Sequence, residues 1–145
     1  MSKFSTVLFV LFLNSSLLLS QEVEIKESIT SFFEVFHKKD VLNLKELCDE
    51  NIKLTSILQN SDGTEIKHES AEQFYNGVQS IPDTILFEEK TFDFSIQHDD
   101  VFAHVWVPYE FYVNGKLSHR GHNSFHLMKK QNRWLIISIT DSRIK

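Results

Sequence analysis

The segment from Val105 to Lys130 concentrates side chains suited to acid–base, metal or ligand chemistry. Its sequence, VWVPYEFYVNGKLSHRGHNSFHLMKK, holds three histidines, a glutamate, an arginine and two tyrosines among alternating apolar residues. These side chains would form a metal site, a catalytic wall or simply the polar face of a sheet, depending on which of them share a face. Successive residues of a strand point to opposite faces, so the strand register decides the chemistry.

The dipeptide Asn114-Gly115 sets the first register, because it is a strong signal for a two-residue hairpin turn. Such a turn pairs Val113 with Lys116, although a bulge at Pro108 would shift the pairing beyond it. One predicted face carries Ala103, Val105, Val107, Tyr109, Phe111, Arg120, His122, Ser124 and His126. The other carries Phe102, His104, Trp106, Glu110, Tyr112, His119, Asn123, Phe125 and Leu127, with Glu110 and His119 as an exposed pair.

The last hairpin adds the end of the chain to the first of these faces. If residues 130–133 form the loop, Lys129 pairs with Trp134 and Asp141 faces His122, whereas a loop one residue longer or shorter would reverse the face. Convergent polar groups within an apolar concavity are typical of a small-molecule pocket. The predicted polar cluster comprises Tyr109, Arg120, His122, Asp141 and Arg143, and its apolar surround comprises Val105, Val107, Phe111, Ile137 and Ile139.

Within this cluster, Asp141 is the candidate catalytic base and His122 its candidate partner, because a buried Asp–His pair can hold a base near neutral pKa. The alternative is structural: Asp141 pairs with Arg120 or Arg143 as an anchor, and His122 is a hydrogen-bonded histidine of the sheet. A bidentate arginine contact would favour the anchor, because such contacts are short and charge-assisted.

The histidines do not predict a metal site. His119 and His122 point to opposite faces, and His122 and His126 lie about 13 Å apart along one face. Zinc ligands must each come within about 2.1 Å of the ion. The sequence also lacks the H-x-H, H-E-x-x-H, G-x-G-x-x-G and P-loop patterns. We therefore expect neither a metal nor a nucleotide cofactor.

The elements that must position these residues follow an α+β pattern. Asp40 and Ser70 are expected helix N-caps, the latter within a capping box, and Asp62-Gly63 is a turn signal. Helices followed by a run of strands indicate a curved antiparallel sheet with the helices packed on one face. The pattern predicts helices over residues 22–40, 40–52 and 70–81, a short hairpin over 51–70, and four long strands between 86 and 143.

The first twenty residues have the pattern of a secretory signal peptide: Lys3, an apolar run over 7–13 and small polar residues near the end. The apolar run is too short to span a bilayer. We expect cleavage after Ser20, which leaves one domain over 21–145. The protein is then exported, either periplasmic or secreted, with no stable membrane anchor once the signal is removed.

Composition excludes some partners. The net charge of −5 without a basic run argues against nucleic acid as a partner. Cys48 is the sole cysteine, so the chain has no internal disulfide, and we expect Cys48 to be a half-buried helix residue rather than a nucleophile.

Over about residues 22–145 the chain resembles the nuclear transport factor 2-like superfamily, most specifically in GKLSHRGHNSFHLMKK followed by WLIISITDSR. Within the superfamily it is most similar to small exported bacterial SnoaL-like and lumazine-binding-like proteins. The resemblance implies a cone-shaped half-barrel packed against about three N-terminal helices, with a pocket inside the cone. Asp141 in SITDSR resembles the aspartate that acts as a base in SnoaL-like cyclases.

The superfamily has no single activity, so three functions remain open. The first is binding of a small, largely apolar molecule in the conical pocket. The second is a lyase, isomerase or cyclase with Asp141 as base and His122 as partner. The third is an oligomerisation domain without a ligand. We also expect a homodimer, because the second predicted face is apolar and needs a cover.

Overall fold

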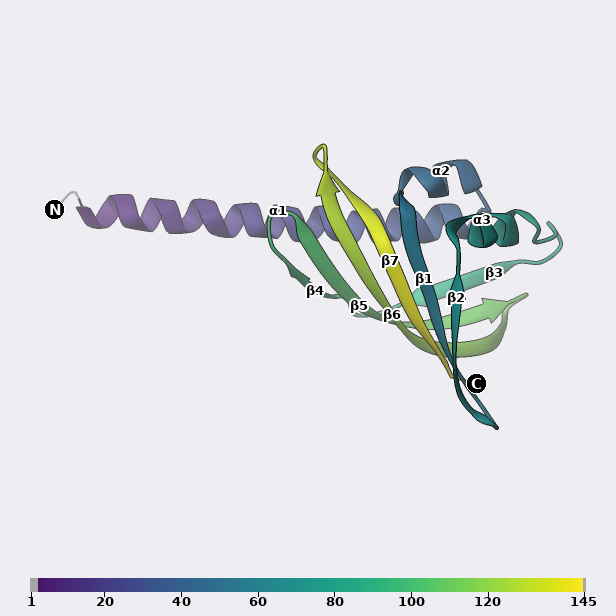
Figure 1. Cartoon of the computed structure of the whole chain (residues 1–145). Helices are drawn as coiled ribbons and strands as arrows, with labels where there is room; N and C mark the ends of the chain where they lie inside the picture. The colour runs from purple at the N-terminus through teal and green to yellow at the C-terminus, as the bar shows by residue number, and fades with distance from the viewer. Residues whose placement is uncertain (1–2, 145) are drawn as a thin grey trace.

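The protein, a computed structural model, is described over residues 3–144. Its order of elements is the predicted α+β order, except that the first of the four predicted long strands is divided into two short ones, Phe87–Thr91 and Ser95–His98. Figure 1 shows the C-terminal part of α1 lying against a curved sheet, while its N-terminal part projects beyond the sheet. The elements are α1 (Lys3–His37), α2 (Val41–Glu46), β1 (Cys48–Asn60), β2 (Gly63–Glu69), α3 (Ala71–Gln79), β3 (Phe87–Thr91), β4 (Ser95–His98), β5 (Phe102–Val113), β6 (Lys116–Lys130) and β7 (Arg133–Ile144).

Within the described residues the sheet is seven-stranded, with the order β2-β1-β7-β6-β5-β3 and β4 also paired to β5. The antiparallel meander from β5 to β7 is confirmed. One pairing departs from the predicted antiparallel sheet: β1 runs parallel to β7, so the sheet is mixed. This pairing places Ser56 of β1 beside Asp141 of β7.

Both hairpins of the meander turn through two left-handed residues. Asn114 and Gly115 have φ of 49° and 76°, and Gln131 and Asn132 have φ of 50° and 58°. Left-handed pairs of this kind match the twist of the flanking strands. The predicted pairings next to both turns are confirmed, since Val113 faces Lys116 and Lys129 faces Trp134.

Farther from the turns the predicted registers are wrong, because each hairpin contains a bulge. Between β5 and β6, Tyr112 faces Leu117 but Phe111 faces His119, which leaves Ser118 as the extra residue. Pro108, where a shift was considered, pairs with His122 without interruption. An extra residue on one strand reverses the side-chain direction of everything beyond it. The face of Tyr109 therefore carries Gly121, Asn123, Phe125 and Leu127, and the opposite face carries Arg120, His122, Ser124 and His126.

The second bulge lies in β7. Leu127 faces Ile136, but His126 faces Ser138, which leaves Ile137 extra. Asp141 consequently faces Asn123 and not His122.

The core lies between α1 and the concave face of the sheet. Ile25, Ile29, Phe32 and Phe33 of α1 are buried against it, and the Phe32 and Phe33 rings meet the Phe125 ring edge-on at 5.9 and 5.7 Å. Phe125 and Leu127, which were predicted on the uncovered face, belong to this core instead, together with Trp134 and Ile136.

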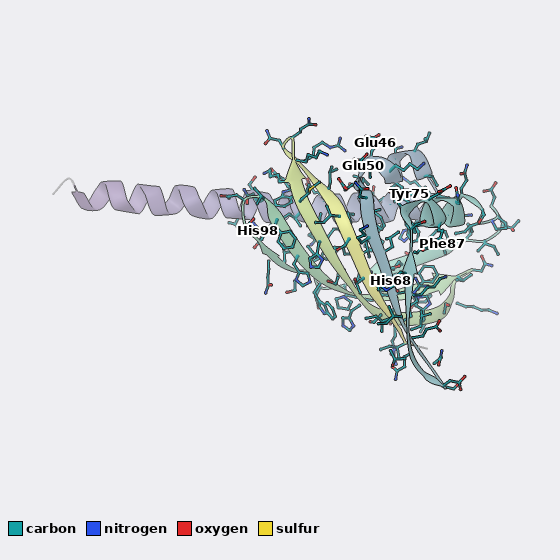
Figure 2. The ribbon with its side chains drawn as sticks, in the orientation of Figure 1. Glu46, Glu50, His68, Tyr75, Phe87 and His98 are labelled. Carbon is teal, nitrogen blue, oxygen red and sulfur yellow. The ribbon has the colours of Figure 1, made fainter. Side chains whose placement is uncertain are left out.

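The shorter helices α2 and α3 pack against β1 and against each other. Ser70 caps α3 through the predicted capping box, in which its Oγ accepts the Gln73 backbone N–H and the Gln73 side chain accepts the Ser70 N–H. Tyr75 of α3, labelled in Figure 2, lies beneath Lys45 of α2, whose Nζ is 5.2 Å from the ring centroid. α2 is shorter than predicted, so Cys48 begins β1 and is not helical. Burial raises the pKa of the Cys48 thiol to about 11.

α1 continues as one helix across the predicted cleavage position after Ser20, and from residue 19 onward, where side-chain burial is described, its first fully buried side chain is Ile25. Among the residues that the structure describes, no helix combines the length and apolarity needed to cross a membrane.

Candidate functional site

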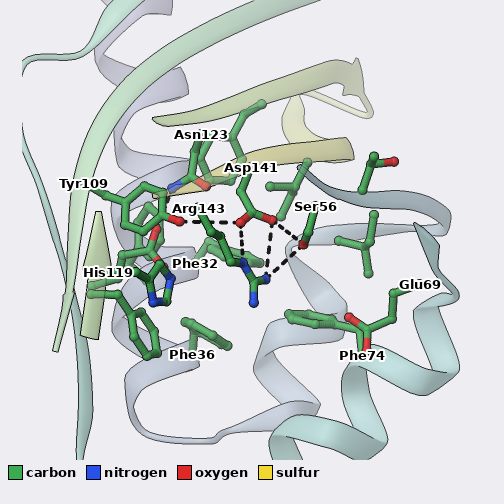
Figure 3. Close-up of a pocket in the computed structure, with 17 residues that line it drawn as sticks. Phe32, Phe36, Ser56, Glu69, Phe74, Tyr109, His119, Asn123, Asp141 and Arg143 are labelled. Atoms are coloured by element: carbon green, nitrogen blue, oxygen red, sulfur yellow. Dashed lines mark hydrogen bonds and ion pairs between the residues drawn. The ribbon is translucent and has the colours of Figure 1, made fainter. Parts of the chain in front are cut away.

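A cavity of about 210 Å³ lies inside the curved sheet, between α1, α3 and the inward faces of β1, β3 and β5–β7. Phe32, Phe36 and Phe74 form one of its walls with nearly parallel rings (Figure 3). Phe74 lies 6.5 Å from Phe32 with an interplanar angle of 8°, and 6.0 Å from Phe36 with an angle of 26°. Such a wall favours a planar apolar body. The other apolar residues of the lining are Phe33, Leu54, Phe111, Phe125 and Ile139.

The polar end of the cavity is organised around the Asp141 carboxylate. Ser56 Oγ donates to Asp141 Oδ1 at 2.6 Å, and Arg143 Nε donates to Oδ2 at 2.6 Å (Figure 3). Arg143 Nη2 also donates to Oδ1 at 3.4 Å, and the Tyr109 hydroxyl to Oδ2 at 3.4 Å. The Asp141 side chain is 14% exposed and that of Arg143 is 45% exposed, so the pair lies at the boundary between the cavity and solvent.

Strand geometry explains this cluster. Asp141 and Arg143 are two residues apart on β7 and therefore share a face. The close approach of β6 to β7 nearby requires a glycine, because a Cβ on Gly121 would lie 1.7 Å from the Ser142 carbonyl oxygen. The same carbonyl accepts the Tyr109 hydroxyl at 2.9 Å, which fixes the phenol over the cluster.

Glu89 of β3 brings a second carboxyl group into the cavity. Its Oε1 accepts a short hydrogen bond from Asn123 Nδ2, and its backbone N–H donates to His37 Nε2 at 2.9 Å. Burial raises the pKa of Glu89 to about 7; the Asn123 hydrogen bond opposes this rise and the negative charge of Asp141 adds to it. The Glu89 carboxyl is therefore present in both its protonated and its ionised form near neutral pH.

Glu89, His119 and Asn123 line the cavity although no sequence pattern had placed them there. One signal for Glu89 was present in the sequence, since Phe87, an apolar residue, lies two positions earlier on the same strand and therefore shares its face. The bulge at Ser118 brings His119 inward, where its ring stacks on Phe111 at 4.9 Å and meets Tyr109 edge-on at 5.8 Å.

The predicted site residues divide into three groups. Tyr109, Phe111, Asp141 and Arg143 line the cavity together. Val105 and Val107 share their face of β5 but are fully buried in the core, outside the lining. Arg120 and His122 point to the convex face because of the first bulge, and the His122 ring stacks on Trp106 at 4.8 Å. The structure therefore does not form the predicted Asp141–His122 pair, and Arg143 rather than Arg120 contacts Asp141.

Several solved structures share this arrangement of helices around a curved sheet. An NTF2-like protein from Cytophaga hutchinsonii is 16% identical over 86% of this chain and 98% of its own, with a TM-score of 0.70. An NTF2-like protein of unknown function from Shewanella baltica is 12% identical over 88% of this chain and 96% of its own, with a TM-score of 0.67.

A proposed scytalone dehydratase from Novosphingobium aromaticivorans is 9% identical over 90% of this chain and 89% of its own, with a TM-score of 0.70. The chain has the nuclear transport factor 2-like fold. No protein-family model matches the sequence, and no curated protein matches it. At these identities the likeness concerns the fold, so the chemistry rests on this chain's own residues.

Outside the cavity, the nuclear transport factor 2-like sheet carries an aromatic and histidine-rich convex face. The Phe102 ring stacks on His126 at 5.5 Å, and His104 lies 5.1 Å from His126. His104 and His126 also contact the hydroxyls of Ser124 and Ser138 at 3.0 and 2.8 Å. Within residues 3–144, no three His, Cys, Asp or Glu side chains are grouped so that they would hold a metal ion.

Proposed function

We propose that this protein binds a small, largely apolar and uncharged molecule in the cavity. The observation that carries the proposal is an aromatic-walled cavity that ends in a preformed polar cluster, with the Asp141 carboxylate fixed by Ser56 and Arg143. Pockets of this composition bind small molecules by apolar contact and orient them by a few polar groups.

The volume limits the size of the ligand. A dry cavity of about 150 Å³ accommodates benzene. The cavity here, of about 210 Å³, therefore fits one ring with a few further atoms. A compound such as acetophenone has that size, a planar body and one polar group.

The charges of the cluster favour an uncharged ligand. Arg143 and Asp141 compensate each other through their ion pair, and Glu89 is neutral or negative near pH 7. An anionic ligand would have to compete with Asp141 for Arg143, and burying a further charge is costly.

Binding of acetophenone, followed by the chemical shifts of backbone amides in NMR spectra, tests the proposal. We expect saturable shifts for cavity residues, weaker binding by Phe74→Ala, and much weaker binding of benzoate, which has a similar size but a negative charge. Trp106→Ala is the matched control, because Trp106 lies on the convex face. Tighter binding of benzoate, or equal loss in both variants, would refute the proposed ligand class.

A second candidate function is acid–base catalysis, and Glu89 is the observation that favours it. Glu89 titrates near pH 7 and shares the cavity with the ion-paired Asp141. A carboxyl with these properties can act as a general acid or base. Two of the solved structures of this fold carry names as proposed dehydratases, which is consistent with such chemistry. This candidate replaces the predicted Asp141–His122 couple with Glu89 as the acid or base, beside the ion-paired Asp141.

Exchange of the α-protons of acetophenone for deuterium in D₂O tests the catalytic candidate. Enzymic proton transfer would raise the exchange rate above that in buffer, and Glu89→Gln would reduce the added rate by about 100-fold or more. A rate equal to that in buffer while acetophenone binds would leave binding as the function.

A further inference from the structure

We propose that Glu89 selects ligands that carry an uncharged oxygen acceptor, such as a ketone or ether, by donating a hydrogen bond from its protonated carboxyl, and that binding therefore takes up a proton. This inference rests on the proposed function and names its ligand class more narrowly. It concerns a residue that neither the sequence patterns nor the similar proteins assign to any role.

The position of Glu89 supplies the donor. Asn123 Nδ2 donates to Oε1, so Oε2 is the oxygen that carries the proton when the carboxyl is neutral. The His37 contact to the Glu89 backbone N–H fixes β3 at this point. The surrounding rings lower the local dielectric, and hydrogen bonds in such surroundings are stronger than in water. An ionised carboxylate has only acceptors and repels a ketone oxygen.

The charged and titratable groups around Glu89 do not remove its preference for an uncharged oxygen acceptor. Asp141 of β7 favours the protonated carboxyl, while Arg143 favours the ionised one. Burial lowers the pKa of His37, which keeps that ring neutral near pH 7. The remaining titratable groups that line the cavity are Tyr109 of β5, His119 of β6 and Glu69 of β2.

The sign of the pH dependence follows from which form of Glu89 binds. A ligand that prefers the protonated carboxyl raises the pKa of Glu89 in the complex above its value of about 7 in the free protein. The apparent affinity equals the intrinsic affinity multiplied by the fraction of protein in the binding form. The apparent affinity is therefore close to the intrinsic affinity below pH 7, and it falls about tenfold for each pH unit above 7.

Two ligands of the same shape isolate the hydrogen bond. α-Methylstyrene has the skeleton of acetophenone with a methylene group in place of the oxygen. Dissociation constants of both ligands are measured at pH 6 and pH 8, with wild-type protein and with Glu89→Gln. Gln keeps a neutral donor at this position but does not titrate.

For wild-type protein we expect acetophenone to bind about tenfold more weakly at pH 8 than at pH 6, and α-methylstyrene to change much less. With Glu89→Gln the dissociation constant of acetophenone should no longer depend on pH. A dependence that persists in Glu89→Gln would originate from another group, such as His119, and would overturn the proposal. Calorimetric titration of wild-type protein in two buffers of different ionisation enthalpy gives a second test, which does not depend on the variant: acetophenone binding at pH 8 should take up close to one proton.

The remaining outcomes separate this inference from the proposed function. If α-methylstyrene binds as tightly as acetophenone at both pH values, the cavity binds small molecules but Glu89 does not select an acceptor, so only this inference fails. If neither ligand binds at either pH, the proposed function fails and this inference fails with it.

Discussion

Arg143 and Asp141, two residues apart on β7, form an ion pair with the guanidinium Nε 2.6 Å from Oδ2 and Nη2 3.4 Å from Oδ1. The contact is bidentate, and Ser56 and Tyr109 donate to the same carboxylate. Of the two roles that the sequence left open for Asp141, this geometry favours the anchor, because Arg143 and Ser56 engage both oxygens of the carboxylate.

If Asp141 is an anchor, Asp141→Asn should lower the free energy of unfolding by about 1–2 kcal/mol. The loss is below that of a fully buried pair because Arg143 is partly exposed and screened by solvent. Urea denaturation at pH 7 measures it, with Glu110→Gln as a control at a carboxylate outside the cavity, bonded to the Tyr112 hydroxyl. A change as small as that of the control would show that the cluster does not stabilise the fold.

The raised pKa of Glu89 predicts a pH-dependent cost to stability. The unfolded carboxyl loses its proton near its ordinary pKa of 4.5, whereas the folded one keeps it to about 7. The folded state therefore holds more protons between these values, and stability falls as pH rises through this window. Glu89→Gln should unfold with a free energy about 1–3 kcal/mol above that of the wild type at pH 8, and the advantage should shrink toward pH 4.5.

Denaturant unfolding of both proteins at several pH values measures this difference. Glu88→Gln is the matched control, because Glu88 is adjacent but its side chain is 58% exposed. An advantage of Glu89→Gln that is constant with pH, or one shared by Glu88→Gln, would contradict the assignment of the buried proton to Glu89.

Gly121→Ala should destabilise the fold by more than about 2 kcal/mol, because the added Cβ would meet the Ser142 backbone at 1.7 Å and a strand has to move. Gly77→Ala in α3 is the control. Its Cβ meets open space, and Ala is the better helix former by about 1 kcal/mol. In thermal unfolding, the midpoint temperature should therefore be lower than that of the wild type for Gly121→Ala, and equal or higher for Gly77→Ala. Equal midpoints would contradict the close approach of β6 to β7.

We propose that the homodimer expected from the sequence forms through the convex face of the sheet. Trp106 there is 45% exposed and Phe102 43%, and both lie beside stacked histidine rings. We expect a dimer in sedimentation velocity at micromolar concentration and a monomer for Trp106→Glu, which places a charge in the interface. A wild-type monomer would contradict this proposal.

We also propose export with removal of residues 1–20. Expression in a host with a general secretory pathway should give a mature protein that begins at Gln21 or a near neighbour. N-terminal sequencing of the secreted or periplasmic fraction measures this, and recovery of Met1 from a membrane fraction would indicate an anchor instead.

The order of elements and the two hairpin turns were predictable because they depend on local signals. Asn114-Gly115 specifies its turn, and Ser70 with Gln73 specifies the start of α3. Tyr109, Phe111, Asp141 and Arg143 share the inward face as predicted because the two bulges, at Ser118 and Ile137, offset each other in the register between β5 and β7.

The placement of Arg120, His122 and His119 was not predictable, because it depends on one extra residue at Ser118. A bulge of this kind has no clear local signature, and it follows from packing Phe125 and Leu127 under α1. The contribution of β1 and β3 also depends on tertiary contacts. Ser56 comes to Asp141 only through the parallel pairing of β1 with β7, and Glu89 comes to Asn123 across the cavity.

The most direct test of the central claim, that the cavity binds a small uncharged molecule, is the location of bound acetophenone by intermolecular nuclear Overhauser effects. We expect contacts from the phenyl protons to the rings of Phe32, Phe36 and Phe74, and from the methyl protons to the end that holds Tyr109 and Asn123. Contacts confined to Trp106 and Phe102 on the convex face, with none to the three phenylalanines, would contradict it.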